Sequence, residues 1–271
     1  MHSKLFQIGP VEIHSYGLML AISFLVGIYY SMYRAKKTGI DPNKIIDLSV
    51  IIVISAIFGS RFLYVIFHLD EFKGHWLDTF NPFQSSGQIG IAGLTMLGGL
   101  IAAVVSGLIY LKLKRLPVLK ITDIIIPAIG LGIFITRIGC FLNGCCYGVP
   151  TDAPWGVIFP QDSPAGYTFP GQPIHPAQLY SSLYGLIIFG LIIFFERYKK
   201  FDGLLLYIFF ILYGISRFTV DIFRYYEESM VFLQIGNFSI SINQVISLIL
   251  IVIGGVLIYV SSVRLKSPQA T

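Results

Sequence analysis

Residues 203–224 read GLLLYIFFILYGISRFTVDIFR, a nearly unbroken apolar run that decides the fold class. A helix of about 20 residues crosses the roughly 30 Å hydrocarbon core of a bilayer, so this stretch is long enough to span a membrane. The whole chain has the same character, since 55% of its 271 residues are hydrophobic, 12% are charged and the mean hydropathy is +0.76. A soluble domain carries about 25% charged residues. The composition therefore predicts an all-α integral membrane protein.

Similar apolar runs recur on both sides of this stretch and predict seven membrane-spanning helices in a single polytopic domain, 1–271. The runs are continuous rather than alternating, and a lone strand cannot satisfy its backbone in lipid, so strands are not expected across the membrane. The first run is followed by basic residues without a small-residue cleavage site, which favours a retained span over a signal peptide. The expected spans are 15–33, 46–69, 92–112, 121–143, 175–195, 203–224 and 243–262.

Basic residues between the spans predict the orientation. Thirteen of the 19 Lys and Arg residues would lie on one side of the membrane, and two, Lys4 and Lys73, on the other. Because Lys and Arg accumulate in cytoplasmic loops, we expect the N-terminus outside and the C-terminus in the cytoplasm. The net charge of +5 then reflects contact with anionic lipid head groups and predicts no nucleic-acid partner.

The segment 144–174 differs from the other connections between spans. It contains six prolines, five glycines and neither Lys nor Arg. Long loops of this kind are commonly functional. We expect a small periplasmic head, or lid, between the fourth and fifth spans.

The remaining four basic residues are arginines within or at the end of apolar spans. An Arg in mid-span costs at least about 2.5–3.5 kcal/mol on insertion scales, so it is usually retained for a function. Arg61 and Arg224 can be explained by side chains that reach nearby head groups. Arg137 and Arg217 lie deeper, and for them a functional explanation is favoured.

The sixth expected span carries a polar stripe. Tyr213, Arg217, Asp221 and Arg224 follow one another at intervals of three or four residues and therefore share one helical face. Asp221 can neutralise one arginine, but the second leaves a positive charge facing the helix bundle. Because guanidinium binds phosphate bidentately and stays charged, the stripe predicts a site for the head group of an anionic phospholipid.

The fourth expected span ends in TRIGCFLNGCCYG, residues 136–148. Close helix packing explains the glycines, but it does not explain Arg137 and Asn143 beside them. The cysteines Cys140, Cys145 and Cys146 leave four interpretations open: small buried packing residues, a disulfide at an oxidising outer face, a reactive thiol, or a zinc site. Their spacing lacks the usual C-x2-C ligand pattern, so no metal and no soluble cofactor is expected.

Two histidines lie at expected helix starts. His175 and Gln178 share a face with Ser182, and a histidine at such a place is either an interfacial or capping residue, or a base. His14 precedes Tyr16 at the outer boundary of the first span, where aromatic anchors are ordinary.

Taken together, these motifs resemble the bacterial phosphatidylglycerol–prolipoprotein diacylglyceryl transferase family. The similar segments run along almost the whole chain, and the set in this order is specific although each piece is short. They are Ile8–Pro10, His14–Gly17, Gly59–Arg61 with Tyr64, Gly139–Gly148 preceded by Arg137, His175–Tyr180, and Tyr213-Gly214 followed by Arg217, Asp221 and Arg224.

The resemblance implies an enzyme of the bacterial inner membrane that moves the diacylglyceryl group of phosphatidylglycerol onto the lipobox cysteine of a prolipoprotein and releases glycerol phosphate. It implies that Arg137 and Arg217 hold the phosphate and stabilise the leaving group, while Tyr16 and Tyr213 position lipid or acceptor. The expected substrate-binding residues are Arg61, Asn143, Gly148, His175, Gln178, Arg224, Asp221, Gly98, Gly99 and His14.

Three positions depart from the family pattern. Leu97 stands where the family usually has His before Gly-Gly, and Cys140 and Cys145 replace its usual Asn and Glu. Since a thiol acceptor must become a thiolate to attack, we expect a divergent member that uses another base, with His14 and His175 as candidates, or another thiol or nucleophile as acceptor. The alternative is a non-catalytic phospholipid-binding or transport protein, although the chain lacks the internal repeat typical of transporters.

Overall fold

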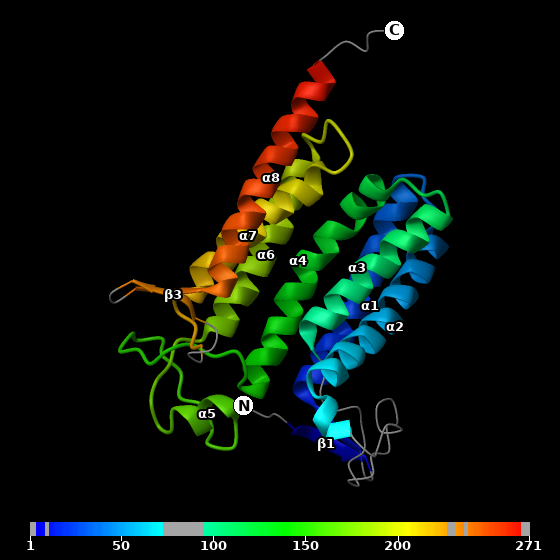
Figure 1. Cartoon of the computed structure of the whole chain (residues 1–271). Helices are drawn as coiled ribbons and strands as arrows, with labels where there is room; N and C mark the ends of the chain where they lie inside the picture. The colour runs from blue at the N-terminus through cyan, green and yellow to red at the C-terminus, as the bar shows by residue number, and fades with distance from the viewer. Residues whose placement is uncertain (1–3, 9–10, 73–94, 227–230, 236–237, 267–271) are drawn as a thin grey trace. The chain divides into compact units, whose positions relative to one another are not determined.

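The computed structural model describes residues 4–8, 11–72, 95–226, 231–235 and 238–266 (Figure 1). Within these residues, seven helices are long and apolar enough to cross a membrane, which confirms the prediction of an all-α membrane protein with seven spans. They are α1 (Ser15–Lys37), α2 (Pro42–Phe67), α3 (Met96–Leu113), α4 (Val118–Asn143), α6 (Ala177–Glu196), α7 (Leu204–Asp221) and α8 (Ile242–Lys266).

The shorter elements all lie outside these helices. Two antiparallel hairpins pair β1 (Lys4–Ile8) with β2 (Val11–His14) and β3 (Val231–Ile235) with β4 (Phe238–Ser241). A 3-10 turn, η1 (Leu69–Phe72), follows α2, and a single helical turn, α5 (Pro164–Thr168), lies between α4 and α6.

The chain divides into two compact units. The α2–α3 unit comprises Ser31–Ile121, and the larger unit comprises Met1–Tyr30 with Thr122–Thr271. In the α2–α3 unit, a Cβ atom added to Gly59 would lie 2.6 Å from the carbonyl oxygen of Gly98, so the two helix backbones touch at this point. The Tyr110 hydroxyl also donates to Asp47 Oδ2 at 3.0 Å.

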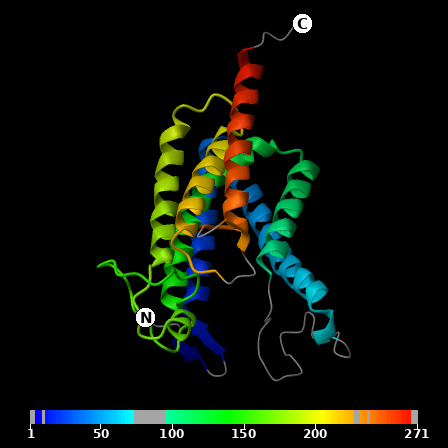
Figure 2. The ribbon, with the colours of Figure 1, turned by 60° about the vertical axis from the view of Figure 1, so that its left-hand side comes forward.

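The larger unit contains the start of α1 together with α4, α6, α7 and α8. Figures 1 and 2 both show α6, α7 and α8 side by side. Small residues bring neighbouring helices into contact, since a Cβ on Gly185 would lie 2.7 Å from the backbone nitrogen of Phe134, and one on Gly214 would lie 2.7 Å from the carbonyl of Ser247. An apolar cluster of Ile126, Ile188, Ile192 and Leu205 fills the space among α4, α6 and α7.

Residues 144–174 form an ordered substructure with a core of its own. Phe159, Ala165 and Ile174 are buried together, and Phe169 packs against them. In Figures 1 and 2 α5 and the β1–β2 hairpin lie at the end of the helices where α4 ends, whereas α8 ends at the opposite end. The segment therefore sits at the helix ends where α4 finishes. Arg137 lies about 9 Å from this end, measured along the axis of α4.

Candidate functional site

The polar stripe of α7 is held by an ordered network. Arg217 pairs with Asp221 at 3.4 Å and donates from Nη2 to the Tyr226 hydroxyl at 2.6 Å. That hydroxyl donates to Asp221 Oδ1 at 2.6 Å and accepts from Asn243 Nδ2 at 3.2 Å, while Ser241 Oγ donates to Asp221 Oδ2. Asp221 is buried, and its charge is satisfied by three partners, Arg217, Tyr226 and Ser241.

Tyr226 lies just beyond the end of α7. Burial raises the pKa of its hydroxyl to about 12, and the hydrogen bond to Asp221 acts in the same direction, whereas the charges of Arg217 and Arg224 oppose it. Tyr226 is therefore a neutral hydrogen-bond donor at physiological pH.

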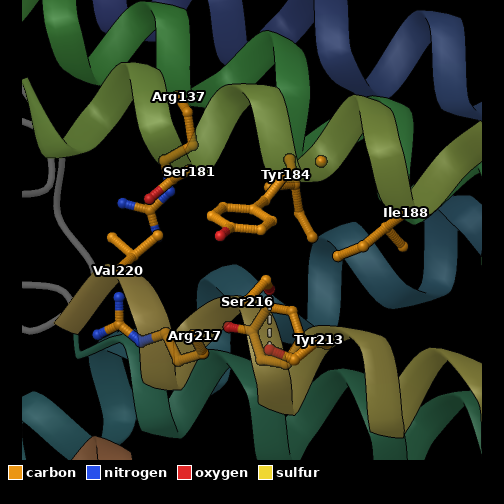
Figure 3. Close-up of a pocket in the computed structure, with 10 residues that line it drawn as sticks. Arg137, Ser181, Tyr184, Ile188, Tyr213, Ser216, Arg217 and Val220 are labelled. Carbon is orange, nitrogen blue, oxygen red and sulfur yellow. Dashed lines mark hydrogen bonds between the residues drawn. The ribbon is translucent and has the colours of Figure 1, made fainter. Parts of the chain in front are cut away.

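A small, partly open pocket lies among α4, α6 and α7. In Figure 3 the guanidinium groups of Arg137 and Arg217 lie at the same end of this pocket, with the rings of Tyr184 and Tyr213 beside them. The complete lining consists of Ile133, Arg137, Ser181, Tyr184, Gly185, Ile188, Tyr213, Ser216, Arg217 and Val220. The structure thus brings three of the residues predicted to be catalytic into one pocket.

The charge of this pocket is positive. Its lining contains two arginines and neither Asp, Glu nor His, and Asp221, which pairs with Arg217 from outside the lining, offsets one of the two charges. The pocket is therefore suited to an anion with several oxygen atoms, such as a phosphate ester.

The end of α4 turns back on itself in a Schellman motif. The Gly144 amide donates to the Phe141 carbonyl at 3.2 Å and the Cys145 amide to the Cys140 carbonyl at 3.1 Å, with Gly144 at φ +71°. In this motif the second residue after the helix end, Cys145, lies against the third residue before it, Cys140. The motif therefore explains why Cys145 lies beside Cys140.

Cys146 continues the turn with a φ of +59°, which a residue with a side chain rarely adopts. The neighbouring thiols of Cys140 and Cys145, together with the positive charges of Arg224 and Arg137, hold its pKa below the usual range. All three cysteines are free thiols. The sequence left a packing role, a disulfide, a reactive thiol and a zinc site open, and the structure clusters the three side chains within electrostatic range of Arg137.

Three predicted binding residues lie beside this turn. Gln178 is fully buried, and its Nε2 donates to the Cys145 carbonyl at 2.8 Å, while its Oε1 lacks a hydrogen-bond partner among the described residues. Arg224 lies over the Tyr226 ring, 4.9 Å from its centroid. Gly148 is wedged between backbones, since a Cβ there would lie 2.5 Å from the carbonyls of both His175 and Phe223, so its small size is required by packing.

Other predicted residues of the larger unit lie around the same end of the helices. Tyr16 is within electrostatic range of Arg137 and of the three cysteines, and its backbone passes close to α4, because a Cβ on Gly139 would lie 3.4 Å from the α-carbon of Tyr16. His175 hydrogen-bonds through Nδ1 to the Tyr180 hydroxyl at 3.0 Å. His14 is exposed at the end of β2, and Asn143 is half-buried at the end of α4.

Arg61, Gly98 and Gly99 belong to the α2–α3 unit. Arg61 is buried, with its guanidinium 5.6 Å from the centroid of the Tyr64 ring. Gly98 and Gly99 lie against α2, where a Cβ would be 2.3 Å from the Gly59 carbonyl and 2.4 Å from Ser60 Oγ respectively. Leu97, which stands at the family's histidine position, is exposed.

Sequence reasoning missed several polar residues of the site. Ser181 and Tyr184 of α6 line the pocket, and their spacing of three residues makes them neighbours on one helical face. Ser216 lines it from α7, next to Arg217. Tyr226 lies beyond the end of α7, so the spacing of polar residues along that helix does not predict it.

Comparison with known proteins supports a relationship along nearly the full length of the chain. The sequence model of the prolipoprotein diacylglyceryl transferase family matches residues 3–260. A phosphatidylglycerol–prolipoprotein diacylglyceryl transferase of Campylobacter hominis is 32% identical over 257 residues, which cover 92% of this chain and 87% of that protein. Proteins of the same name from Clostridium tetani (31% identity, 94% and 95% covered) and Finegoldia magna (35% identity, 93% and 92% covered) are similar to a comparable extent.

Proposed function

This chain belongs to the prolipoprotein diacylglyceryl transferase family, and we propose that it moves the diacylglyceryl group of phosphatidylglycerol onto the lipobox cysteine thiol of a prolipoprotein. The observation that carries the proposal is the pairing of Arg137 and Arg217 in one pocket whose lining holds no acidic side chain. The phosphodiester of a phospholipid is an anion whose oxygen atoms can accept bidentate hydrogen bonds from two guanidinium groups.

The reaction is a displacement at the glycerol carbon that carries the phosphate. The acceptor sulfur attacks that carbon, a C–S bond forms, and the C–O bond to the phosphate breaks. The electron pair stays on the phosphate oxygen, and glycerol phosphate leaves. Arg137 and Arg217 would stabilise the charge that develops on this oxygen, which is where preorganised donors accelerate a reaction most.

The tyrosines of the site would position the reactants. Tyr213 and Tyr184 line the pocket beside the arginines and offer hydroxyl groups to the glycerol part of the lipid. Tyr16 lies near Arg137 and the cysteine turn, where an acceptor thiol would approach. Their flat rings also suit the boundary between acyl chains and head groups.

The placement in the membrane follows from the seven spans and the distribution of basic residues. This is a multi-pass membrane protein. We propose that it lies in the bacterial cytoplasmic membrane with the N-terminus outside, which puts the ends of α4 and α7 at the outer leaflet. Residues 144–174 would then form a periplasmic head that restricts access of water to the pocket, consistent with the contact of Gly148 with the segment after α7.

The test is a transfer assay with the purified full-length protein, phosphatidylglycerol in detergent micelles and a lipobox peptide. We expect Arg137→Gln and Arg217→Gln each to lower glycerol phosphate release about a hundredfold, as loss of one donor to a developing oxyanion typically does. Arg264→Gln, at an exposed position near the end of α8, is the matched control and should keep the wild-type rate. A wild-type rate for Arg137→Gln, with an unchanged thermal unfolding midpoint, would show the proposal to be wrong.

A further inference from the structure

The three thiols at the end of α4 form a cluster that the proposed displacement does not use. The Sγ atoms of Cys140, Cys145 and Cys146 all lie within 4.8 Å of one another. They are the only cysteines of the chain. Clustering of all three in one turn therefore needs its own explanation.

The backbone of this turn brings the three side chains together. The Schellman motif sets Cys145 against Cys140, and the positive φ of Cys146 directs its side chain to the same side as that of its neighbour. In an extended chain, adjacent side chains point to opposite faces. A rarely populated conformation held at a clustered thiol is the kind of outlier that points to a function.

The spacing of the sulfur atoms suits a metal ion better than a disulfide. Three sulfurs around a tetrahedral Zn²⁺ with bonds of about 2.3 Å lie about 3.8 Å apart. The observed separations, up to 4.8 Å, reach this value with side-chain shifts of less than about 1 Å. A disulfide would draw two sulfurs to about 2 Å and leave the third unused.

We propose that Cys140, Cys145 and Cys146 bind a thiophilic divalent metal ion of the Zn²⁺ class, and that the open fourth position of this ion takes the acceptor thiol. Three protein ligands and one open position are typical of catalytic zinc sites. Cys140 is buried, whereas Cys145 and Cys146 are half-buried, so the cluster is reachable from the side of the latter two.

The charges around the cluster balance such a complex. Four thiolates around a divalent ion carry two net negative charges, and two guanidiniums act on Cys146, those of Arg137 and Arg224. Arg137 interacts electrostatically with this thiol and also lines the pocket, so it links the cluster to the pocket. Gln178 fixes the carbonyl of Cys145, the kind of support that orients metal ligands.

The role of the ion follows from what the pocket lacks, and this part of the inference rests on the proposed function. A thiol attacks as a thiolate, but the pocket lining offers no carboxylate or imidazole to remove the proton. A thiol that coordinates a metal ion is deprotonated outright. The ion would therefore act in place of a general base.

The acceptor thiol binds the ion and releases its proton to solvent. Its sulfur then forms the C–S bond as the C–O bond to phosphate breaks, and the phosphate oxygen keeps the electron pair beside Arg137 and Arg217. The product is a neutral thioether, a weaker ligand than a thiolate, so it leaves the ion and reopens the fourth position.

Cobalt titration of the reduced, metal-stripped full-length protein in detergent tests the site directly. Because the chain has three cysteines, any thiolate-to-cobalt charge-transfer absorbance comes from this cluster. We expect saturation at one Co²⁺ per chain, and Cys140→Ser, Cys145→Ser and Cys146→Ser should each weaken binding by at least about tenfold. Tyr147→Phe, adjacent to Cys146 but without a thiol, is the control and should bind Co²⁺ as the wild type does.

Two results on the wild type overturn the site without reliance on variants. One is the absence of charge-transfer absorbance on Co²⁺ addition. The other is alkylation of a single cysteine in protein isolated without reductant, which would assign the other two to a disulfide.

The role of the ion has separate readouts. A lipobox peptide should increase the cobalt charge-transfer absorbance, and the same peptide with Ser in place of Cys should not. Equal spectra with the two peptides, or a wild-type transfer rate in metal-stripped protein, would overturn the activation step while the transferase assignment stands. Binding of Co²⁺ and of the peptide thiol without any transfer would refute the proposed function while the metal site stands.

Discussion

Arg137 and Arg217 carry the same charge in different surroundings. Arg217 is paired with Asp221 and hydrogen-bonded to Tyr226, so its position is fixed before any ligand binds. Arg137 faces the cysteine turn instead. We therefore regard Arg217 as a preorganised anchor for the phosphate, and Arg137 as the connection between the phosphate and the site of sulfur attack.

Tyr226 tests the importance of that anchor. Tyr226→Phe removes the hydrogen bond to Asp221 and the acceptor of Arg217, so we expect a loss of about 1.5–3 kcal/mol in the free energy of unfolding, as for hydrogen bonds to charged groups. The measurement is thermal unfolding in detergent, with Tyr167→Phe at an exposed position as the control.

The same variant gives a pH prediction. The pKa of Tyr226 is about 12 in the folded protein and near 10.0 when the chain is unfolded. The folded state therefore keeps a proton that the unfolded state releases, and this stabilisation is complete below pH 10 and is lost as the pH rises toward 12. The difference in unfolding midpoint between wild type and Tyr226→Phe should shrink over that range; a difference independent of pH would contradict the assignment.

At the scale of single residues, periodicity predicted what lies within helices. The intervals between Tyr213, Arg217 and Asp221 placed them on one face, and the structure confirms that Arg217 and Asp221 pair. Tyr226 was not predicted because it reaches Asp221 from beyond the helix end. The pKa shift of its hydroxyl depends on that tertiary contact.

At the scale of elements, the start of α7 is fixed by a side chain of α4. Asp123 is buried and accepts from the amides of Gly203 at 2.8 Å and Leu206 at 3.2 Å, and Lys199 pairs with it at 2.9 Å. The first amides of a helix have no partners within the helix. Asp123 supplies an acceptor to two of them from a neighbouring helix and so joins α4 to α7 at the end opposite the cysteine turn.

Asp123→Ala should therefore destabilise the larger unit. It leaves Lys199 and the amides of Gly203 and Leu206 without this partner, and because Lys199 is partly exposed we expect a loss of about 1–3 kcal/mol, as for an unsatisfied buried polar group. Asp202→Ala is a matched control, because Asp202 also pairs with Lys199 at 2.9 Å but is exposed, and exposed pairs contribute about 0–1 kcal/mol. Equal unfolding midpoints for the two variants would show that the cap does not hold α7.

The sequence predicted the spanning elements well because length and hydropathy alone define them. Their ends were less accurate, and α2 shows why. It begins at Pro42 rather than at residue 46, because the side chain of Asp41 caps it by accepting from the Asn43 amide at 2.9 Å. The polar first turn conceals this start from a hydropathy reading, although Asp-Pro is itself a helix-start signal.

At the scale of the whole molecule, an odd number of spans places the two ends of the chain on opposite sides of the membrane. The distribution of Lys and Arg predicts that the C-terminus is cytoplasmic. Green fluorescent protein fused to the C-terminus should therefore fluoresce, and alkaline phosphatase fused there should be inactive. An active phosphatase fusion would reverse the orientation and move the pocket to the inner leaflet.

The division into two compact units was not visible in the sequence, and the expectation of a single polytopic domain stays a prediction. Hydropathy does not distinguish a helix that contacts one neighbour from a helix that contacts three. The contact between Gly59 and Gly98 illustrates this, because the sequence indicated close packing at Gly98 but could not name the partner. Likewise, the spacing of the cysteines gave no metal-ligand pattern, whereas the turn after Asn143 clusters all three.

The central claim is that Arg137 and Arg217 hold the phosphate that leaves when a thiol takes the diacylglyceryl group. Its most direct test is mass spectrometry of a lipobox peptide after incubation with purified protein and phosphatidylglycerol, with glycerol phosphate measured in the same sample. We expect a thioether-linked diacylglyceryl peptide and glycerol phosphate in equal amounts. An unmodified peptide with no glycerol phosphate would contradict the claim.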